Sequence, residues 1–166
     1  MSRIGIYAGS FDPPTLGHLW MIRQGAELFD ELVVALAVNP EKRAFLSTDD
    51  RRAALEEMVA GLAEPGRVRV EVVAHGFLVD FAREAGATCL LRGVRNSTDF
   101  EYEKTMARVN ARMEAGIRTV FLTPPGELEE ISSSLVRGFV GVPGWERWVA
   151  ACVPPSVFDR IALLYK

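Results

Sequence analysis

Apolar segments alternate along the chain with longer segments in which hydrophobic residues recur every three or four positions. The apolar segments are short and nearly continuous, as expected for strands that are buried on both faces of a parallel sheet. β-Branched residues are frequent in them, which also favours strands. We predict five strands, over residues 3–8, 32–38, 68–73, 87–91 and 118–122.

The segments between these strands have the periodicity of amphipathic helices. Asp12 is predicted to cap the first helix, which begins near Pro13-Pro14-Thr15, because aspartate is a common N-cap and proline is favoured in a first turn. Ser47 and Asp50 have the spacing of a capping box and predict the start of the second helix. Further helices are predicted over residues 77–84 and 99–114, from the serine run at 132–134, and after Pro155.

Strands that alternate with helices predict βαβ units, and therefore a parallel sheet with helices on both faces. We expect an α/β fold of the Rossmann-like, doubly wound type, with five parallel strands in a single domain over residues 1–166. Ligands of such sheets bind beyond the carboxyl ends of the strands. The loops in which to look for a site begin at Gly9, Asn39, His75, Arg92 and Thr123.

The composition is that of an ordinary globular protein, with 49% hydrophobic and 25% charged residues. A formal net charge of −3 argues against a broad nucleic-acid surface. The longest apolar run, residues 32–38, is too short to cross a bilayer, and Met1-Ser2-Arg3 lacks the layout of a signal peptide. Cys89 and Cys152 suggest neither a disulfide scaffold nor a zinc site. We therefore expect a cytoplasmic protein without nucleic-acid or membrane partners.

The segment YAGSFDPPTLGH, residues 7–18, joins the first strand to the first helix. Packing accounts for its apolar residues but not for Ser10 or His18. A helix N-terminus presents free N–H groups and the positive end of a dipole, which suits phosphate. His18 lies one turn into the helix, so its imidazole can reach an anion at the helix start. The convergence of the Gly-Ser turn, the helix start and the histidine favours a phosphate site over a histidine that only packs.

Two further loops at the same sheet edge carry cations. Arg92 and Arg95 follow the fourth strand, and Gly93 permits close approach of the backbone to a ligand. Two arginines in this position favour bidentate binding of an oxyanion over simple solvation. Lys42 and Arg43 follow the second strand, where such a pair is more commonly a solvated part of a loop.

The serine run at 132–134 opens a predicted helix on another loop of this edge. One serine would be an ordinary helix cap, whereas three suggest a second site for an anion. The sequence contains no Walker loop and no GxGxxG motif, and His75 has no cysteine or serine partner at a recognised spacing. The candidate residues are cationic or hydroxylic, which suits a reaction between activated groups that need positioning and charge neutralisation.

Three of these segments resemble the motifs of a known enzyme family. GSFDPPTLGH resembles the GxFDPxTxGH signature of nucleotidyltransferases with a T/HxGH motif. RGVRNSTDFEYE and ISSSLVR are similar to the RGxRxxxDFxYE and ISSSxVR motifs of the bacterial phosphopantetheine adenylyltransferase family. The first motif indicates the superfamily, and the other two make the match specific. The resemblance extends from about residue 3 to residue 140.

The resemblance implies transfer of AMP from ATP to 4′-phosphopantetheine, which gives dephospho-coenzyme A and pyrophosphate, with Mg²⁺ carried by the ATP phosphates rather than by protein ligands. It implies that His18 stabilises the transition state and that Lys42 and Arg92 are catalytic with it. The implied acceptor side comprises Ser10, Lys42, Leu78 and Arg92. The implied ATP side comprises Ser10, Phe11, His18, Gly93, Val94, Arg95, Glu103, Leu128, Glu129, Glu130, Ile131, Ser132, Ser133 and Ser134.

By the same resemblance, the acceptor phosphate attacks the α-phosphorus in line, and the protein is a homohexamer. The chain departs from the family at Trp20, where a small acidic residue is usual, and in the ELEE segment, where an aromatic residue is frequent. Two alternatives remain. A mononucleotide adenylyltransferase or cytidylyltransferase of the same superfamily would lack the second motif. A silent nucleotide-binding protein would not need His18, Lys42 and both arginines together.

Overall fold

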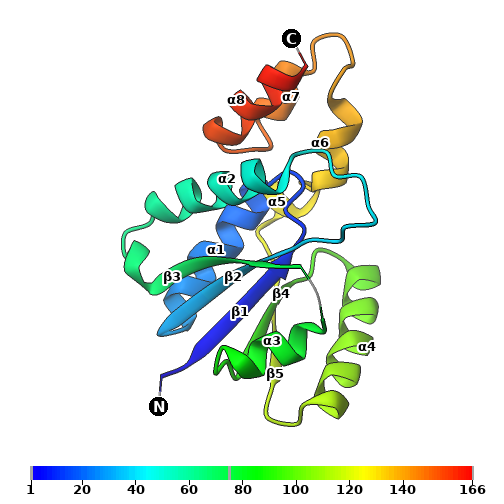
Figure 1. Ribbon diagram of the computed structural model, residues 1–166. Coiled ribbons are helices and arrows are strands. Elements are labelled where there is room, and N and C mark those ends of the chain that lie inside the picture. Colours follow the sequence, from blue (N-terminus) through cyan, green and yellow to red (C-terminus); the bar gives the residue numbers. More distant parts are fainter. Residues whose placement is uncertain (1, 75, 166) are drawn as a thin grey trace.

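The computed structural model describes residues 2–74 and 76–165. Within these residues the predicted strands form one parallel sheet in the order β3-β2-β1-β4-β5 (Figure 1). Each strand lies close to its predicted bounds, and the apolar residues of the three central strands are largely buried. The strands are β1 (Ile4–Gly9), β2 (Glu31–Ala37), β3 (Val68–Val73), β4 (Cys89–Gly93) and β5 (Arg118–Leu122).

Helices follow the strands as the periodicity predicts, and two short helices add to them. The unpredicted ones, α5 and α7, span only one turn or slightly more, too little for a periodic pattern to show. Within the described residues no helix is both long and apolar enough to span a membrane. The helices are α1 (Leu16–Leu28), α2 (Thr48–Ala60), α3 (Leu78–Glu84), α4 (Ser97–Met113), α5 (Gly126–Glu129), α6 (Ser133–Phe139), α7 (Glu146–Ala150) and α8 (Pro155–Leu164), with a 3₁₀ turn at Pro65–Arg67.

Successive residues of a strand point to opposite faces of the sheet, and both faces are covered by helices. In β2, Val34 belongs to a core that includes Met21 of α1 and Leu55 of α2. Its neighbour Val33 belongs to a second core, which includes Val79 of α3. Both valines are fully buried, which explains why the strand sequence is apolar without alternation. The predicted doubly wound α/β fold is thus confirmed.

The order of the strands reverses beside β1. This strand pairs with β2 on one side and with β4 on the other. The chain runs outward from β1 to β3, returns to β4 next to β1, and continues to β5. At such a reversal the connections after the two central strands diverge, and a crevice opens at the carboxyl edge of the sheet. The segments after Gly9 and Gly93 therefore form two walls of that crevice.

The helices after β5 form a separate layer beyond the carboxyl ends of the strands (Figure 1). Trp145, Val149 and Ile161 from this layer share a core with Leu46 and with Ala54 of α2. An ion pair between Arg160 of α8 and Glu57 of α2, at 2.6 Å, also connects this layer to α2. This packing fixes α6, and with it the serine run, above the crevice.

The prediction that Asp12 caps the first helix is wrong. Helix α1 begins at Leu16, and its N-cap is Thr15, whose hydroxyl accepts a hydrogen bond from the His18 N–H. The Asp12 carboxylate instead accepts hydrogen bonds from Phe45 and Leu46, in the loop after β2. Helix α2 begins as predicted, because the Ser47 hydroxyl accepts from the Asp50 N–H at 3.0 Å.

Candidate active site

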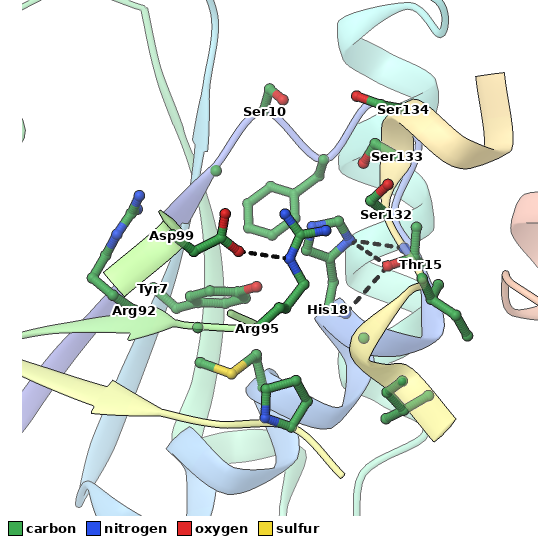
Figure 2. Close-up of a pocket in the computed structure, with 18 of the residues that line it drawn as sticks. Tyr7, Ser10, Thr15, His18, Arg92, Arg95, Asp99, Ser132, Ser133 and Ser134 are labelled. Carbon is green, nitrogen blue, oxygen red and sulfur yellow. Dashed lines mark hydrogen bonds and ion pairs between the residues drawn. The ribbon is translucent and has the colours of Figure 1, made fainter. Parts of the chain in front are cut away.

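The turn after β1 brings the signature segment into the crevice. Phe11 has a φ of +46°, in the left-handed region that non-glycine residues rarely occupy. Its ring is buried and packs edge-on against His18, with the ring centroids 5.0 Å apart. The side chain of Arg51 donates a hydrogen bond to the Ser10 carbonyl oxygen at 2.8 Å. These two contacts hold the turn in a strained conformation that places Ser10 at the mouth of the crevice (Figure 2).

His18 is oriented by the start of its own helix. The Thr15 backbone N–H donates to Nδ1 of His18 at 2.9 Å, while the Thr15 hydroxyl accepts from the His18 N–H (Figure 2). This reciprocal arrangement is a capping box in which histidine takes the place of the usual glutamate. Because Nδ1 accepts a hydrogen bond, the proton of the neutral ring must lie on Nε2. The imidazole thus has one N–H donor left for a ligand.

His18 is neutral rather than cationic at physiological pH. Burial in the crevice, with the positive charge of Arg95 nearby, lowers the pKa of His18 to about 4. The ring therefore contributes to the site as a hydrogen-bond donor through Nε2–H. Burial also raises the pKa of the Tyr7 phenol, so this neighbour keeps its proton as well.

The end of β4 and the loop after it carry two arginines, each of which forms an ion pair. Arg92 forms a double hydrogen bond with the Glu103 carboxylate, at 2.8 and 2.5 Å, and donates to the Ala8 carbonyl oxygen at 2.9 Å. Burial would lower the pKa of Arg92, but the hydrogen bonds and charge of Glu103 outweigh burial and raise it. Arg95 donates to Asp99 through Nε at 2.9 Å. Figure 2 shows the Arg95 guanidinium between Asp99 and His18.

The serine run faces these arginines across the crevice, but its members have different tasks. Ser132 caps α6 by accepting from the Leu135 N–H at 3.1 Å. Ser133 donates to the Pro13 carbonyl oxygen at 2.8 Å and so ties α6 to the signature turn. Ser134 accepts from the Arg137 side chain at 3.0 Å. The three hydroxyls line the crevice together (Figure 2).

The crevice is a cavity of about 360 Å³ that brings most of the predicted site residues together. They come from the turn after β1, the start of α1, the end of β4 and the loop after it, α4, and the segment from α5 to the start of α6. Its lining includes the predicted residues Ser10, Phe11, His18, Arg92, Gly93, Arg95, Glu103, Leu128, Ile131, Ser132, Ser133 and Ser134.

The remaining predicted residues lie outside this cavity. Lys42 lines an adjoining cavity that shares Ser10 with the first, and Leu78 lines another that shares Arg92. Val94 is buried and does not line this cavity, and its backbone N–H donates to the Leu122 carbonyl oxygen at 2.8 Å. Glu129 and Glu130 are exposed, since α5 turns them to solvent. His75 lies outside the described residues.

Several lining residues were not predicted. Thr15 could have been found from its spacing of three residues to His18, which is that of a capping box. Asp99 lies in the first turn of α4, four residues after Arg95, a spacing at which opposite charges can pair. Tyr7, Met21 and the other unpredicted lining residues carry no comparable signal, because apolar and aromatic residues in a core segment usually only pack.

A family model and curated relatives match the chain. The model, described as cytidylyltransferase-like, matches residues 6–139. A phosphopantetheine adenylyltransferase of Chromobacterium violaceum is 45% identical over 160 residues, covering 96% of each chain. The enzyme of the same name from Neisseria meningitidis serogroup B is 45% identical over 159 residues, covering 96% of this chain and 92% of its own. The one from Clavibacter michiganensis is 43% identical and covers 98% of both chains.

Solved structures share the fold at low sequence identity. A nicotinic acid mononucleotide adenylyltransferase of Plasmodium falciparum, complexed with NaAD, has a TM-score of 0.75 and 16% identity, covering 99% of this chain and 96% of its own. Thermotoga maritima TmcAL, bound with alpha-thio ATP, has a TM-score of 0.67 and 14% identity, covering 98% of this chain and 55% of its own. With the three motifs gathered at one sheet edge, the sequence matches show that this chain belongs to the phosphopantetheine adenylyltransferases, within the cytidylyltransferase-like family.

Proposed function

We propose that this protein transfers AMP from ATP to 4′-phosphopantetheine, which gives dephospho-coenzyme A and pyrophosphate. The observation that carries the proposal is the arrangement of His18, Arg95 and the serine run around one cavity at the strand reversal. From Arg92, a second cavity of about 470 Å³ runs along the ends of β2 and β3 to Leu78. The first cavity suits a nucleoside triphosphate, and the second suits an elongated acceptor. Relatives 45% identical over 96% of the chain carry the corresponding name.

ATP is proposed to lie with its phosphates between Arg95 and the serine run. Arg95 uses only Nε for its hydrogen bond to Asp99, and Figure 2 shows its guanidinium directed into the crevice. Adenine and ribose are proposed to lie beside Gly93, which lines the cavity, and Val94, the buried residue that follows it. Glu103 lines the same cavity and is held there by its ion pair with Arg92.

The acceptor phosphate is proposed to attack the α-phosphorus of ATP in line. A phosphate oxygen forms the new P–O bond as the bond to the β-phosphate breaks, and pyrophosphate leaves with the electron pair. The attacking oxygen is already anionic, so no general base is required. Asp99 and Glu103, the carboxylates among the described lining residues, are both held in ion pairs with arginines. Both carboxylates are therefore already engaged as acceptors of arginine hydrogen bonds.

His18 is proposed to donate through Nε2–H to a non-bridging oxygen of the α-phosphate. Negative charge on the equatorial oxygens must be accommodated as the pentacoordinate centre forms. A donor whose position is fixed beforehand by Thr15 costs no reorganisation at that moment. Lys42 and Arg92 are proposed to hold the acceptor phosphate, with Arg92 pre-oriented by Glu103 and the Ala8 carbonyl.

Magnesium is proposed to enter as part of the substrate, bound to the phosphates of ATP. No group of three or more histidine, cysteine, aspartate or glutamate side chains suited to hold a metal occurs among the described residues. The carboxylates of the crevice are engaged with Arg92 and Arg95, so they do not make a ready set of metal ligands. Oxygen ligands from the triphosphate suit Mg²⁺ better than this protein lining does.

A homo-oligomer, expected to be a homohexamer, is proposed to form through α4. None of the residues of this helix, all of which the structure describes, is buried. Tyr102, Met106, Val109 and Met113 form an apolar stripe at spacings of four, three and four. Their exposed fractions of 36–64% are high for such large side chains. A second copy of the chain would cover the stripe.

The oligomer is tested by sedimentation velocity on the wild type and on the double variant Val109→Glu, Met113→Glu. The charges would be buried without partners if the stripe lies between copies. We expect the wild type to sediment as an assembly and the variant as a smaller species with an unchanged circular dichroism spectrum. A monomeric wild type, or a variant with the same sedimentation coefficient, contradicts the proposed interface.

The acceptor is tested by pyrophosphate release from ATP with three acceptors at equal concentration. Phosphopantetheine should support turnover. Pantetheine should fail because its hydroxyl would need a base, and no suitable base lines the crevice among the described residues. Nicotinic acid mononucleotide should fail because its short, rigid ribosyl group cannot occupy the cavity that leads to Leu78. Turnover with pantetheine would contradict direct attack by phosphate, and turnover with the mononucleotide would indicate the alternative activity.

The role of His18 is tested with His18→Asn. The asparagine side-chain oxygen can replace Nδ1 as the acceptor for the Thr15 N–H, so the helix cap is preserved while the Nε2–H donor is lost. We expect kcat to fall about 100- to 1000-fold, as when one such donor is removed. The KM for ATP should change little, and a thermal melt checks the fold. A variant with near-normal kcat would show that the donor is not used.

A further inference from the structure

Asp12 connects two loops that are far apart in the sequence. Its carboxylate accepts a hydrogen bond from the Phe45 N–H through Oδ2 and one from the Leu46 N–H through Oδ1, each at 2.8 Å. Both carboxylate oxygens are thus engaged, and both donors are backbone groups of the loop after β2. Since Thr15 caps α1, the position of this aspartate in the signature segment is explained by neither helix formation nor contact with the ATP cavity.

The loop held by Asp12 is the one that carries Lys42. At the end of β2, the Val38 N–H donates to the Val73 carbonyl oxygen at 2.9 Å. From there the chain is exposed until Phe45, and Lys42 lies within that exposed stretch. Leu46 is fully buried, and the Phe45 ring stacks on Tyr165 with centroids 5.5 Å apart. The bonds to Asp12 therefore fix the second end of the stretch.

The backbone of Asp12 and of its neighbours in the turn after β1 is held in place as well. Its backbone carbonyl oxygen accepts a hydrogen bond from the Arg137 side chain of α6. The neighbouring carbonyl oxygens are held as well, that of Ser10 by Arg51 and that of Pro13 by Ser133. Asp12 is thus a rigid junction between the turn that leads to His18 and the loop with Lys42.

We infer that Asp12 is a positioning residue for the acceptor phosphate, which acts by fixing the Lys42 loop relative to His18. The inference rests on the proposed function, in which Lys42 binds that phosphate. Attack in line requires the acceptor oxygen and the α-phosphorus to be held in a defined relative position, and a displacement of about 1 Å can be costly in rate. A carboxylate that accepts two backbone hydrogen bonds is well suited to keep two loops in register.

The central variant is Asp12→Asn. Its amide oxygen can accept only one of the two hydrogen bonds, and its amide NH₂ then faces the other backbone N–H. We expect the KM for phosphopantetheine to rise about tenfold, which corresponds to the loss of about one hydrogen bond, while the KM for ATP stays within about twofold. Hydrogen exchange at the Phe45 and Leu46 amides should become faster. Asp12→Glu keeps the charge but displaces the carboxylate. For this second variant we also expect a higher KM for phosphopantetheine.

Ser47→Ala is the matched control. It removes the cap of α2 next to the same loop, and so it lowers stability without touching the bonds made by Asp12. We expect this control to melt earlier and to keep both KM values. If it reproduces the selective rise in the KM for phosphopantetheine, that rise reports lower stability, and the inference is wrong.

A Lys42→Ala variant distinguishes the proposed role of Lys42 in phosphate binding from the inferred positioning role of Asp12. If Lys42→Ala leaves the KM for phosphopantetheine unchanged, the proposed role of Lys42 fails. If it raises this KM but Asp12→Asn and Asp12→Glu do not, the positioning role of Asp12 fails on its own. When both claims hold, adding Asp12→Asn to Lys42→Ala should raise the KM little further, because Asp12 acts through Lys42. Additive effects of the two substitutions would contradict this dependence.

Discussion

The hydrogen bond from the Thr15 backbone N–H to Nδ1 of His18 connects the fold to the chemistry. It satisfies one of the donors at the start of α1, and it also determines which nitrogen of the ring carries the proton. Because His18 is part of this cap, the contact that starts α1 at Leu16 also orients the imidazole toward the crevice. The position of the Nε2–H donor thus depends on the contact that starts the helix. The Phe11 ring of the strained turn packs against the same imidazole.

The charges of the crevice are balanced before any substrate binds. Its described lining contains Arg92 and Arg95 as cations and Asp99 and Glu103 as anions, in two ion pairs, beside a neutral His18. Affinity for phosphate there depends on directed N–H and O–H donors rather than on excess positive charge. Among the described residues, excess positive charge occurs in the adjoining cavity, whose lining has Lys42, Arg43, Arg51 and Arg137 against one carboxylate, that of Asp12. That distribution is consistent with a dianionic acceptor phosphate approaching from this side.

The fold could be predicted from the sequence because strands that are buried on both faces of a sheet are apolar along most of their length. It also predicted that the loops after β1 and β4 meet, since the carboxyl ends of parallel strands lie at one edge. Other features depend on contacts between distant segments, which no local pattern reports. The bonds of Asp12 to Phe45 and Leu46 are of this kind, and so is the pairing of Arg92 with Glu103. The neutrality of His18 likewise follows from burial and from the charge of Arg95, neither of which its own segment shows.

In this active site His18 is a neutral ring whose proton lies on Nε2. Long-range ¹H–¹⁵N correlation spectra of the ¹⁵N-labelled protein measure this directly. The chain has only two histidines, and the spectrum of His18→Asn assigns them. We predict an unprotonated Nδ1 and a protonated Nε2 at pH 7, with a pKa about 4 on titration, well below the ordinary value of about 6.5. A proton on Nδ1, or a titration midpoint near the ordinary value, would show that His18 does not offer Nε2–H as the donor in this site.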